Sequence, residues 1–345
     1  MQHGSPYGTH RVIEPPGVLP QGAWKIDNTM QVFDNEILIQ VSVLNIDAAS
    51  FTQIKQEAAG DLARIEAAMC GIVAQRGKHH NPVTGSGGML IGTVLQIGTA
   101  LQGRCDLAVG DRIATLVSLS LTPLVIERVR AIHLERDQVE IDGQAILFET
   151  GLYAKLPDDI PENVALAILD VAGAPAQTAR LVQSGDTVLV IGGAGKSGTL
   201  CVYEARKRAG AGGCVIGVSP FAADCARMRE LGWVDHALQV DATNALALLE
   251  AVAALTQGRL ADVVINCVNI PDTEMGSILA TREGGTIYFF SMATRFTAAA
   301  LGAEGVGKDV QMLVGNGYAR GHAELALNLL RESPRLRQLF ERLYV

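Results

Sequence analysis

A glycine-rich turn just past the middle of this 345-residue chain places the strongest limit on its fold. Residues 187–191 read TVLVI, as in a buried parallel strand, and they run into GGAGKSG at 192–198. Gly193, Gly195 and Gly198 match the spacing G-x-G-x-x-G, which between a strand and a helix predicts a dinucleotide-binding turn. The phosphate-loop pattern G-x-x-x-x-G-K-[ST] is excluded, because its first glycine would fall on Val190 inside the strand.

Helices and strands alternate from residue 162 onwards. We expect helices over 162–182, 197–209, 220–231, 243–257 and 273–281. We expect strands over 187–191, 214–218, 237–240, 262–267, 285–291 and 310–314. Strict alternation predicts an α/β fold in which helices flank a doubly wound parallel sheet. This Rossmann domain would span residues 161–345.

The preceding residues, 1–160, predict a second domain of a different class. Residues 1–35 are turn-rich, and EILIQVSVLNI from Glu36 reads as a strand. Apolar residues at three- and four-residue spacing predict a helix over 53–70. Short β-rich stretches separated by glycine turns follow, which predicts a partly open β-barrel.

The candidate cofactor residues lie where the strands of the expected parallel sheet end. At the end of the second strand, Ser219 stands where NAD-binding domains usually carry Asp or Glu. A serine with a nearby arginine suits a 2′-phosphate, so the pattern favours NADP over NAD, although Ser219 could instead simply cap the next helix. The full candidate set is Gly193, Ala194, Gly195, Lys196, Ser197, Gly198, Ser219, Arg227, Cys267 and Ser291.

Composition excludes several classes of partner. The net charge is −8 and no block of like charges occurs, which argues against nucleic acid or an anionic membrane. No stretch approaches the roughly 18 apolar residues of a membrane span, and the N-terminal residues lack the apolar core of a secretion signal. None of the 6 cysteines forms a C-x-x-C pair. We therefore expect a cytoplasmic protein with reduced thiols.

Three segments in the first domain resemble a known superfamily. LNIDAASF, NPVTGSGGMLIGTVLQIG and VGDRIA occur in the order found in medium-chain dehydrogenases and reductases. That resemblance implies an N-terminal GroES-like barrel, a Rossmann domain and pairing into a homodimer. GTHRVIEPPGVLPQGAWKIDN, HHNPVTGSGGMLIGTV and VGNGYARGHAE further resemble the L-erythro-3,5-diaminohexanoate dehydrogenase family of bacterial lysine fermentation. This resemblance implies oxidative deamination of that small diamino acid to (S)-5-amino-3-oxohexanoate with NAD(P)+, in amino-acid degradation.

The chain departs from the zinc-dependent members of the superfamily. Those enzymes read Gly-His-Glu where this chain has Gly85-Ser86-Gly87, and they carry a cysteine where Ile46-Asp47 stands. The third ligand position corresponds to about Asp170. Because none of these places holds a soft ligand, we expect no metal.

Amine oxidation without zinc requires a group that takes a proton from the substrate ammonium and returns it later. Asp170, Asp47 and His80 are the candidates, although Asp170 and Asp47 could have local structural roles and His79 competes with its neighbour. Asp170 interrupts an apolar stretch, where an unpaired buried carboxylate would be costly. Arg11, Glu14, Asn81 and Ser86 are the candidate substrate-binding residues. Arg11 and Glu14 could equally tie the N-terminal segment to the barrel.

Two other functions remain compatible with the sequence. One is a zinc-free, NADPH-dependent quinone or enoyl reductase of the same superfamily, which would need an apolar substrate slot. The other is a redox-sensing protein that binds NADP without turnover.

Overall fold

The computed structural model describes residues 2–291, 293–315 and 317–344. The chain divides into two compact units, residues 1–158 (unit 1) and residues 159–345 (unit 2). Each unit has its own hydrophobic core. Among the described residues, no helix combines the length and the apolar character needed to cross a membrane.

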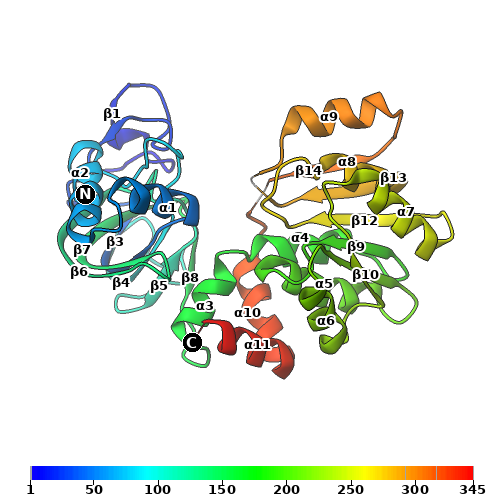
Figure 1. Cartoon of the computed structure of the whole chain (residues 1–345). Coiled ribbons are helices and arrows are strands. Elements are labelled where there is room, and N and C mark those ends of the chain that lie inside the picture. The colour runs from blue at the N-terminus through cyan, green and yellow to red at the C-terminus, as the bar shows by residue number, and fades with distance from the viewer. Residues whose placement is uncertain (1, 292, 316, 345) are drawn as a thin grey trace. The chain divides into compact units, whose positions relative to one another are not determined.

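Unit 2 contains a six-stranded parallel sheet with the strand order β11-β10-β9-β12-β13-β14. This is the order 3-2-1-4-5-6 of a Rossmann fold, so the predicted doubly wound sheet is confirmed (Figure 1). The strands are β9 (Thr187–Ile191), β10 (Cys214–Ser219), β11 (His236–Gln239), β12 (Ala261–Asn266), β13 (Thr281–Phe289) and β14 (Gln311–Val314).

Helices cover both faces of this sheet, which is why the central strands β9, β10 and β12 are largely apolar and buried. Leu189 and Ile191 of β9 pack in one cluster with residues of α7, α8 and α9. Val188 and Val190, which point the other way, pack with residues of α4 and α5. Figure 1 shows the two helical layers. The helices of these layers and their neighbour α6 are α4 (Gly173–Leu181), α5 (Lys196–Ala209), α6 (Ala222–Leu231), α7 (Ala245–Thr256), α8 (Glu274–Ala280) and α9 (Phe296–Gly305).

Unit 1 contains a six-stranded antiparallel sheet with the order β6-β7-β3-β4-β5-β8, which bears out the expected β domain. Its strands are β3 (Glu36–Asn45), β4 (Met89–Ile97), β5 (Arg112–Thr115), β6 (Leu124–His133), β7 (Gln138–Phe148) and β8 (Tyr153–Lys155). Helices α1 (Ala48–Glu57) and α2 (Leu62–Arg76) follow β3 in the chain. A 3-10 turn at Thr9–Arg11 and the short pair β1 (Val12–Glu14) and β2 (Lys25–Ile26) precede it.

Two helices predicted as continuous are each divided into two. The predicted helix over 53–70 breaks between α1 and α2, where Ala59 and Gly60 have φ of 50° and 74° and Asp61 caps the second helix. The predicted helix over 162–182 is α3 (Glu162–Leu169) followed by α4, with Asp170 at the end of α3. Both predictions were wrong because apolar spacing continues across each break.

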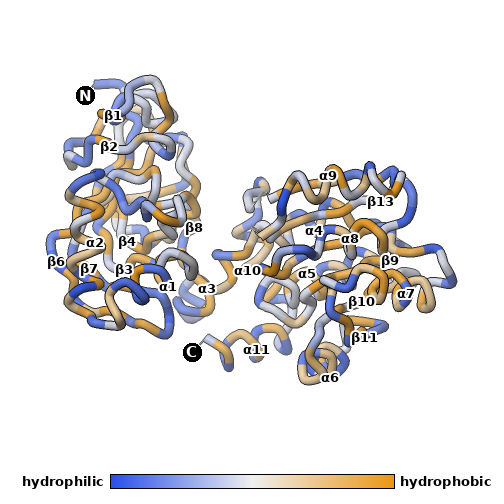
Figure 2. The backbone as a smooth tube through the Cα atoms, turned by 45° about the horizontal axis from the view of Figure 1, so that its top comes forward, coloured by the Kyte–Doolittle hydropathy of each residue, from blue (hydrophilic) through white to orange (hydrophobic). Residues whose placement is uncertain are grey.

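Two amphipathic helices at the end of the described chain were not anticipated. They are α10 (His322–Glu332) and α11 (Pro334–Tyr344). Hydrophilic and hydrophobic residues succeed one another along α11 (Figure 2), and its Leu336, Leu339 and Phe340 are buried. Both helices pack against α3, so they belong to the helical layer that extends α4 and α5.

A buried ion pair ties the N-terminal segment to the sheet of unit 1. Arg11 is only 1% exposed, and its Nε and Nη2 donate to the Glu36 carboxylate at 2.6 and 2.7 Å. The other guanidinium N–H groups donate to the carbonyl oxygens of Asp27, Thr29 and Gln31. Burial alone would raise the pKa of Glu36, but the hydrogen bonds from Arg11 and His10 hold it at about 2.

Removal of this guanidinium should destabilise unit 1 strongly. Arg11→Ala leaves the Glu36 charge buried without its partner, so we expect the free energy of unfolding to fall by about 3–5 kcal/mol. Urea unfolding in a Trp233→Phe background would isolate the fluorescence of Trp24, the remaining tryptophan, which lies in unit 1. The matched control is Arg104→Ala, because Arg104 is 65% exposed and its pair with Glu149 should contribute at most about 1 kcal/mol. Equal losses in the two variants would contradict this account of Arg11.

Candidate functional site

The candidate cofactor residues gather at the carboxyl edge of the sheet in unit 2. Ile191 at the end of β9 is in register with Val218 of β10 and Asn266 of β12, and Asn266 pairs with Phe289 of β13. Ser219 is the last residue of β10, and the glycine turn, Cys267 and Ser291 begin within two residues of the ends of β9, β12 and β13. Ligands of open α/β sheets bind at this edge, where the direction of strand addition reverses.

The glycines of the turn have the roles that a dinucleotide cradle requires. A Cβ on Gly198 would clash with the carbonyl oxygen of Gly192, so α5 packs on the end of β9 only without a side chain there. A Cβ on Gly195 would meet only the Gly192 oxygen, at 3.4 Å, so the outer side of the turn is open to a ligand. No side chain caps the N-terminus of α5, which leaves first-turn N–H groups for an anion. These residues therefore fit a pyrophosphate.

Asp170 is placed differently from what its apolar surroundings suggested. Its side chain is 45% exposed and accepts a hydrogen bond from Lys196 Nζ at 2.5 Å. The helix break at the end of α3 turns the residue out of the apolar layer. The argument from a buried, unpaired carboxylate is therefore wrong, and Asp170 instead neutralises the lysine of the glycine turn.

Ser219 and Arg227 share a third residue, Asp224. The Ser219 hydroxyl donates to Asp224 Oδ2 at 2.7 Å, and Arg227 Nη2 donates to Asp224 Oδ1 at 2.9 Å. Arg227 also donates to the carbonyl oxygen of Ala194 at 2.8 Å, which joins α6 to the glycine turn. Both groups that the sequence offered to a 2′-phosphate are therefore already bound to a carboxylate.

Cys267 and Ser291 flank the same edge. The sulfur of Cys267 lies 3.8 Å from that of Cys201 on α5, and neither is in a disulfide. Burial is the main cause that raises the pKa of Cys201, so this thiol stays protonated. The Ser291 hydroxyl donates to Asn269 Oδ1 and accepts from the N–H of Ala293. Ser291 therefore organises the loop after β13.

In unit 1, a glycine-rich loop holds two polar side chains together. A Cβ on Gly87 would clash with the carbonyl oxygen of His79, and one on Gly88 would clash with the backbone before Asp47. Asp47 caps α1 by accepting from the N–H of Ser50, yet its Oδ2 is buried without a hydrogen-bond partner. Both ring nitrogens of His79 and Nδ1 of His80 are also buried and unpartnered. Unpaired buried polar atoms are costly and uncommon, so this cluster is a candidate for binding a ligand or for a catalytic role.

His79 and His80 face different surroundings. Burial lowers the pKa of His79 to about 4 and outweighs the opposite effects of the Gly87 backbone and the Asp47 charge. Burial, together with the charges of Lys78 and Arg76, lowers the pKa of His80 to about 4. His79 therefore faces an acid while His80 faces cations. The sequence offered no signal to choose between the adjacent histidines, which differ in their burial and in the charges around them.

Two of the candidate substrate-binding residues make contacts that hold unit 1 together, and the other two are partly or fully exposed. Arg11 uses its donors inside unit 1, which favours a structural role over the predicted substrate contact. Asn81 is buried, accepts from the N–H groups of residues 83 and 84 and donates to Gln53 Oε1, so it shapes the loop. Ser86 is half-buried in that loop. Glu14 is exposed on β1.

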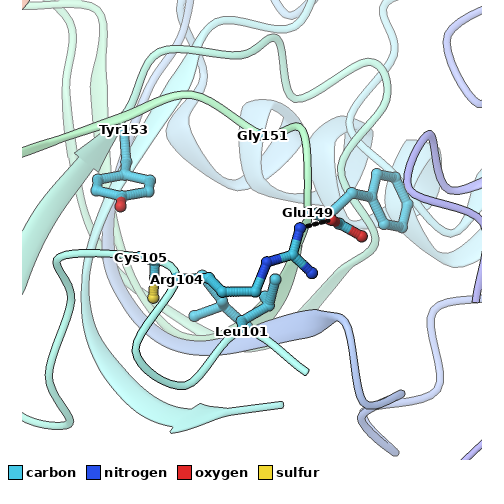
Figure 3. A pocket seen from close by; sticks show the side chains of 8 residues that line it. Leu101, Arg104, Cys105, Glu149, Gly151 and Tyr153 are labelled. Atoms are coloured by element: carbon cyan, nitrogen blue, oxygen red, sulfur yellow. Dashed lines mark hydrogen bonds and ion pairs between the residues drawn. The ribbon is translucent and has the colours of Figure 1, made fainter. Parts of the chain in front are cut away.

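A half-open cavity of about 240 Å³ lies elsewhere in unit 1 (Figure 3). Arg104, Glu149 and Tyr153 line it beside Ile37, which stands at the start of β3. Asp47 follows the other end of this ten-residue strand, roughly 30 Å away for a strand of that length. The cavity is therefore distinct from the Asp47–His79 cluster.

The side chains that could bind a metal in this protein are those of His, Cys, Asp and Glu. In the part of the chain that the structure describes, no group of three or more His, Cys, Asp or Glu side chains is arranged to hold one.

The comparison with known proteins identifies the family. A curated protein of Acetoanaerobium sticklandii named L-erythro-3,5-diaminohexanoate dehydrogenase is 58% identical over 342 residues, 99% of each chain. A protein of the same name from Fusobacterium nucleatum is 57% identical over 345 residues, 100% of each chain. The chain belongs to the L-erythro-3,5-diaminohexanoate dehydrogenase family.

Family models agree with this assignment. The model of the L-erythro-3,5-diaminohexanoate dehydrogenase N-terminal domain matches residues 10–157, and a model described as zinc-binding dehydrogenase matches residues 197–306. Among solved structures, a mycobacterial protein complexed with NADPH has a TM-score of 0.56 at 18% identity, covering 89% of this chain and 83% of that one. This member of the diaminohexanoate dehydrogenase family therefore shares the fold of that protein.

The close contact between Gly198 and Gly192 gives a test of the dinucleotide-binding turn in this member of the diaminohexanoate dehydrogenase family. Gly198→Ala should lower the stability of unit 2 by about 1–3 kcal/mol and weaken binding of a nicotinamide dinucleotide at least tenfold, because the new Cβ pushes α5 away from Gly192. Thermal unfolding and NADH fluorescence titration would measure both effects. The control is Gly212→Ala, whose Cβ meets nothing within 4 Å. Unchanged binding by Gly198→Ala would refute the assigned role of this glycine.

Proposed function

We propose that this protein catalyses the NAD-dependent oxidative deamination of L-erythro-3,5-diaminohexanoate to 5-amino-3-oxohexanoate. The observation that carries the proposal is the 58% identity to a curated dehydrogenase of that name across 99% of both chains. The buried Asp47–His79 cluster supports it, since the reaction needs groups that bind ammonium and move protons.

Unit 2 is the part that would hold the cofactor. The uncapped N-terminus of α5 and the open side of Gly195 would bind its pyrophosphate, and Asp224 would accept from a ribose hydroxyl. The bound nicotinamide supplies the acceptor for the hydride that leaves the amine carbon. We propose NAD as the form used, because Asp224 already engages the two groups that would otherwise favour NADP.

Unit 1 would handle the protons. With a pKa of about 4, His79 is neutral at physiological pH, and the ring nitrogen that carries no hydrogen can accept a proton from the substrate ammonium. Desolvation of the ammonium lowers its own pKa, and Asp47 stabilises the resulting imidazolium, so both effects favour the transfer. After oxidation, water adds to the carbon–nitrogen double bond. The carbon–nitrogen bond then breaks, and the returned proton leaves with ammonia.

Product analysis tests the activity directly. Purified protein with L-erythro-3,5-diaminohexanoate and NAD+ should form NADH and ammonia in equal amounts. L-Lysine, a diamino acid without the 3-amino group, is the matched control and should give neither. Loss of NADPH with quinones or enones, together with no ammonia from the diamine, would favour a quinone or enoyl reductase instead and refute the proposal.

The two histidines provide a paired test of the proton acceptor. His79→Asn should lower kcat by about 10²–10⁴ while leaving NADH binding unchanged, because unit 2 holds the cofactor. His80→Asn should lower kcat less than tenfold. The acid limb of kcat/KM should lie near pH 4, since a lowered pKa keeps His79 deprotonated above that pH. A larger effect of His80→Asn would reverse the assignment.

A further inference from the structure

We propose that Asp224 is the residue that makes this protein select NAD over NADP. Its carboxylate accepts hydrogen bonds from Ser219 and Arg227, which would otherwise bind a 2′-phosphate. The inference rests on the proposed use of a nicotinamide dinucleotide and names the side chain that decides between its two forms.

The position of Asp224 explains why sequence spacing alone points the other way. Dinucleotide folds that prefer NAD usually carry their acid at the end of the second strand, where this chain has Ser219. Asp224 lies five residues later, in the first turn of α6, and reaches back to the strand end. Ser219 is 3% exposed and Asp224 is 27% exposed at the side chain, so the carboxylate presents the accessible face of the pair.

The charges around the turn support exclusion of a phosphate. Arg227 is fixed between Asp224 and the carbonyl oxygen of Ala194, so its positive charge is matched by an acid. Lys196, at the start of α5, likewise forms an ion pair with an acid, Asp170. A 2′-phosphate carries close to two negative charges, and it would meet the Asp224 carboxylate rather than a free guanidinium.

The same carboxylate can still accept from an unmodified ribose. An ionised carboxylate has about four acceptor positions, and Ser219 and Arg227 each use one. A 2′-hydroxyl can donate to one of the remaining positions, whereas a phosphate oxygen has no proton to donate. Asp224 therefore strengthens the binding of NAD and weakens the binding of NADP.

Binding measurements with NADH and NADPH test the proposal without recourse to turnover. The intact protein should bind NADH at least tenfold more tightly than NADPH in fluorescence titrations. Asp224→Asn should raise the affinity for NADPH at least tenfold and lower that for NADH by roughly tenfold, because the carboxylate that accepts from the 2′-hydroxyl is lost. Combining it with Arg227→Leu should abolish the gain, because Arg227 is the group released.

Two further variants complete the design. Asp224→Ser removes the carboxylate in a second way and should shift the preference in the same direction, which keeps the test open if the asparagine variant folds poorly. Glu250→Gln removes an exposed acid from α7 and should leave the NADH to NADPH ratio unchanged.

The outcomes separate this inference from the proposed function. An unchanged ratio in both Asp224 variants, or a preference of the intact protein for NADPH, would overturn the role of Asp224 and leave the proposed dehydrogenase reaction standing. Failure of the intact protein to bind either dinucleotide would overturn both.

Discussion

The close approach of α5 to the end of β9 is the contact on which the rest of unit 2 depends. It requires that Gly198 carry no side chain, because the Gly192 carbonyl oxygen occupies that space. The approach aims the uncapped N-terminus of α5 along the carboxyl edge of the sheet, where β10, β12 and β13 also end. A backbone contact thus fixes where a ligand can lie, and the side chains around it then decide which ligand it is.

Unit 1 relies on buried polar groups, which serve two different purposes. The Arg11–Glu36 pair is fully matched by hydrogen bonds, so it holds the N-terminal segment without capacity for a ligand. Asp47 and His79 are buried with polar atoms unmatched, so they retain that capacity. The two groups thus differ in the count of satisfied polar atoms, not in residue type.

Local patterns predicted the parts of the molecule that depend on neighbouring residues. The glycine spacing and strand–helix alternation located the Rossmann sheet, because each signal lies within a short window of sequence. Ion pairs between residues far apart in the sequence could not be predicted from such short windows. The sequence left Arg11 open between a substrate contact and a tie to the barrel, because its partner Glu36 lies 25 residues away. The apolar stretch around Asp170 predicted a buried acid, but a helix break with little sequence signal turns the residue outward. His79 and His80 are adjacent in sequence, and only their burial and the charges around them in the fold distinguish them.

The missing cap on α5 has a thermodynamic consequence for the protein in the cell. Without a ligand, no side chain satisfies the first-turn N–H groups of this helix. A bound pyrophosphate completes the helix and stabilises the folded state by an amount that grows with the logarithm of ligand concentration. The resistance of unit 2 to unfolding and proteolysis is therefore coupled to the dinucleotide pool. A cell depleted of that pool would hold less of this protein, even at an unchanged rate of synthesis.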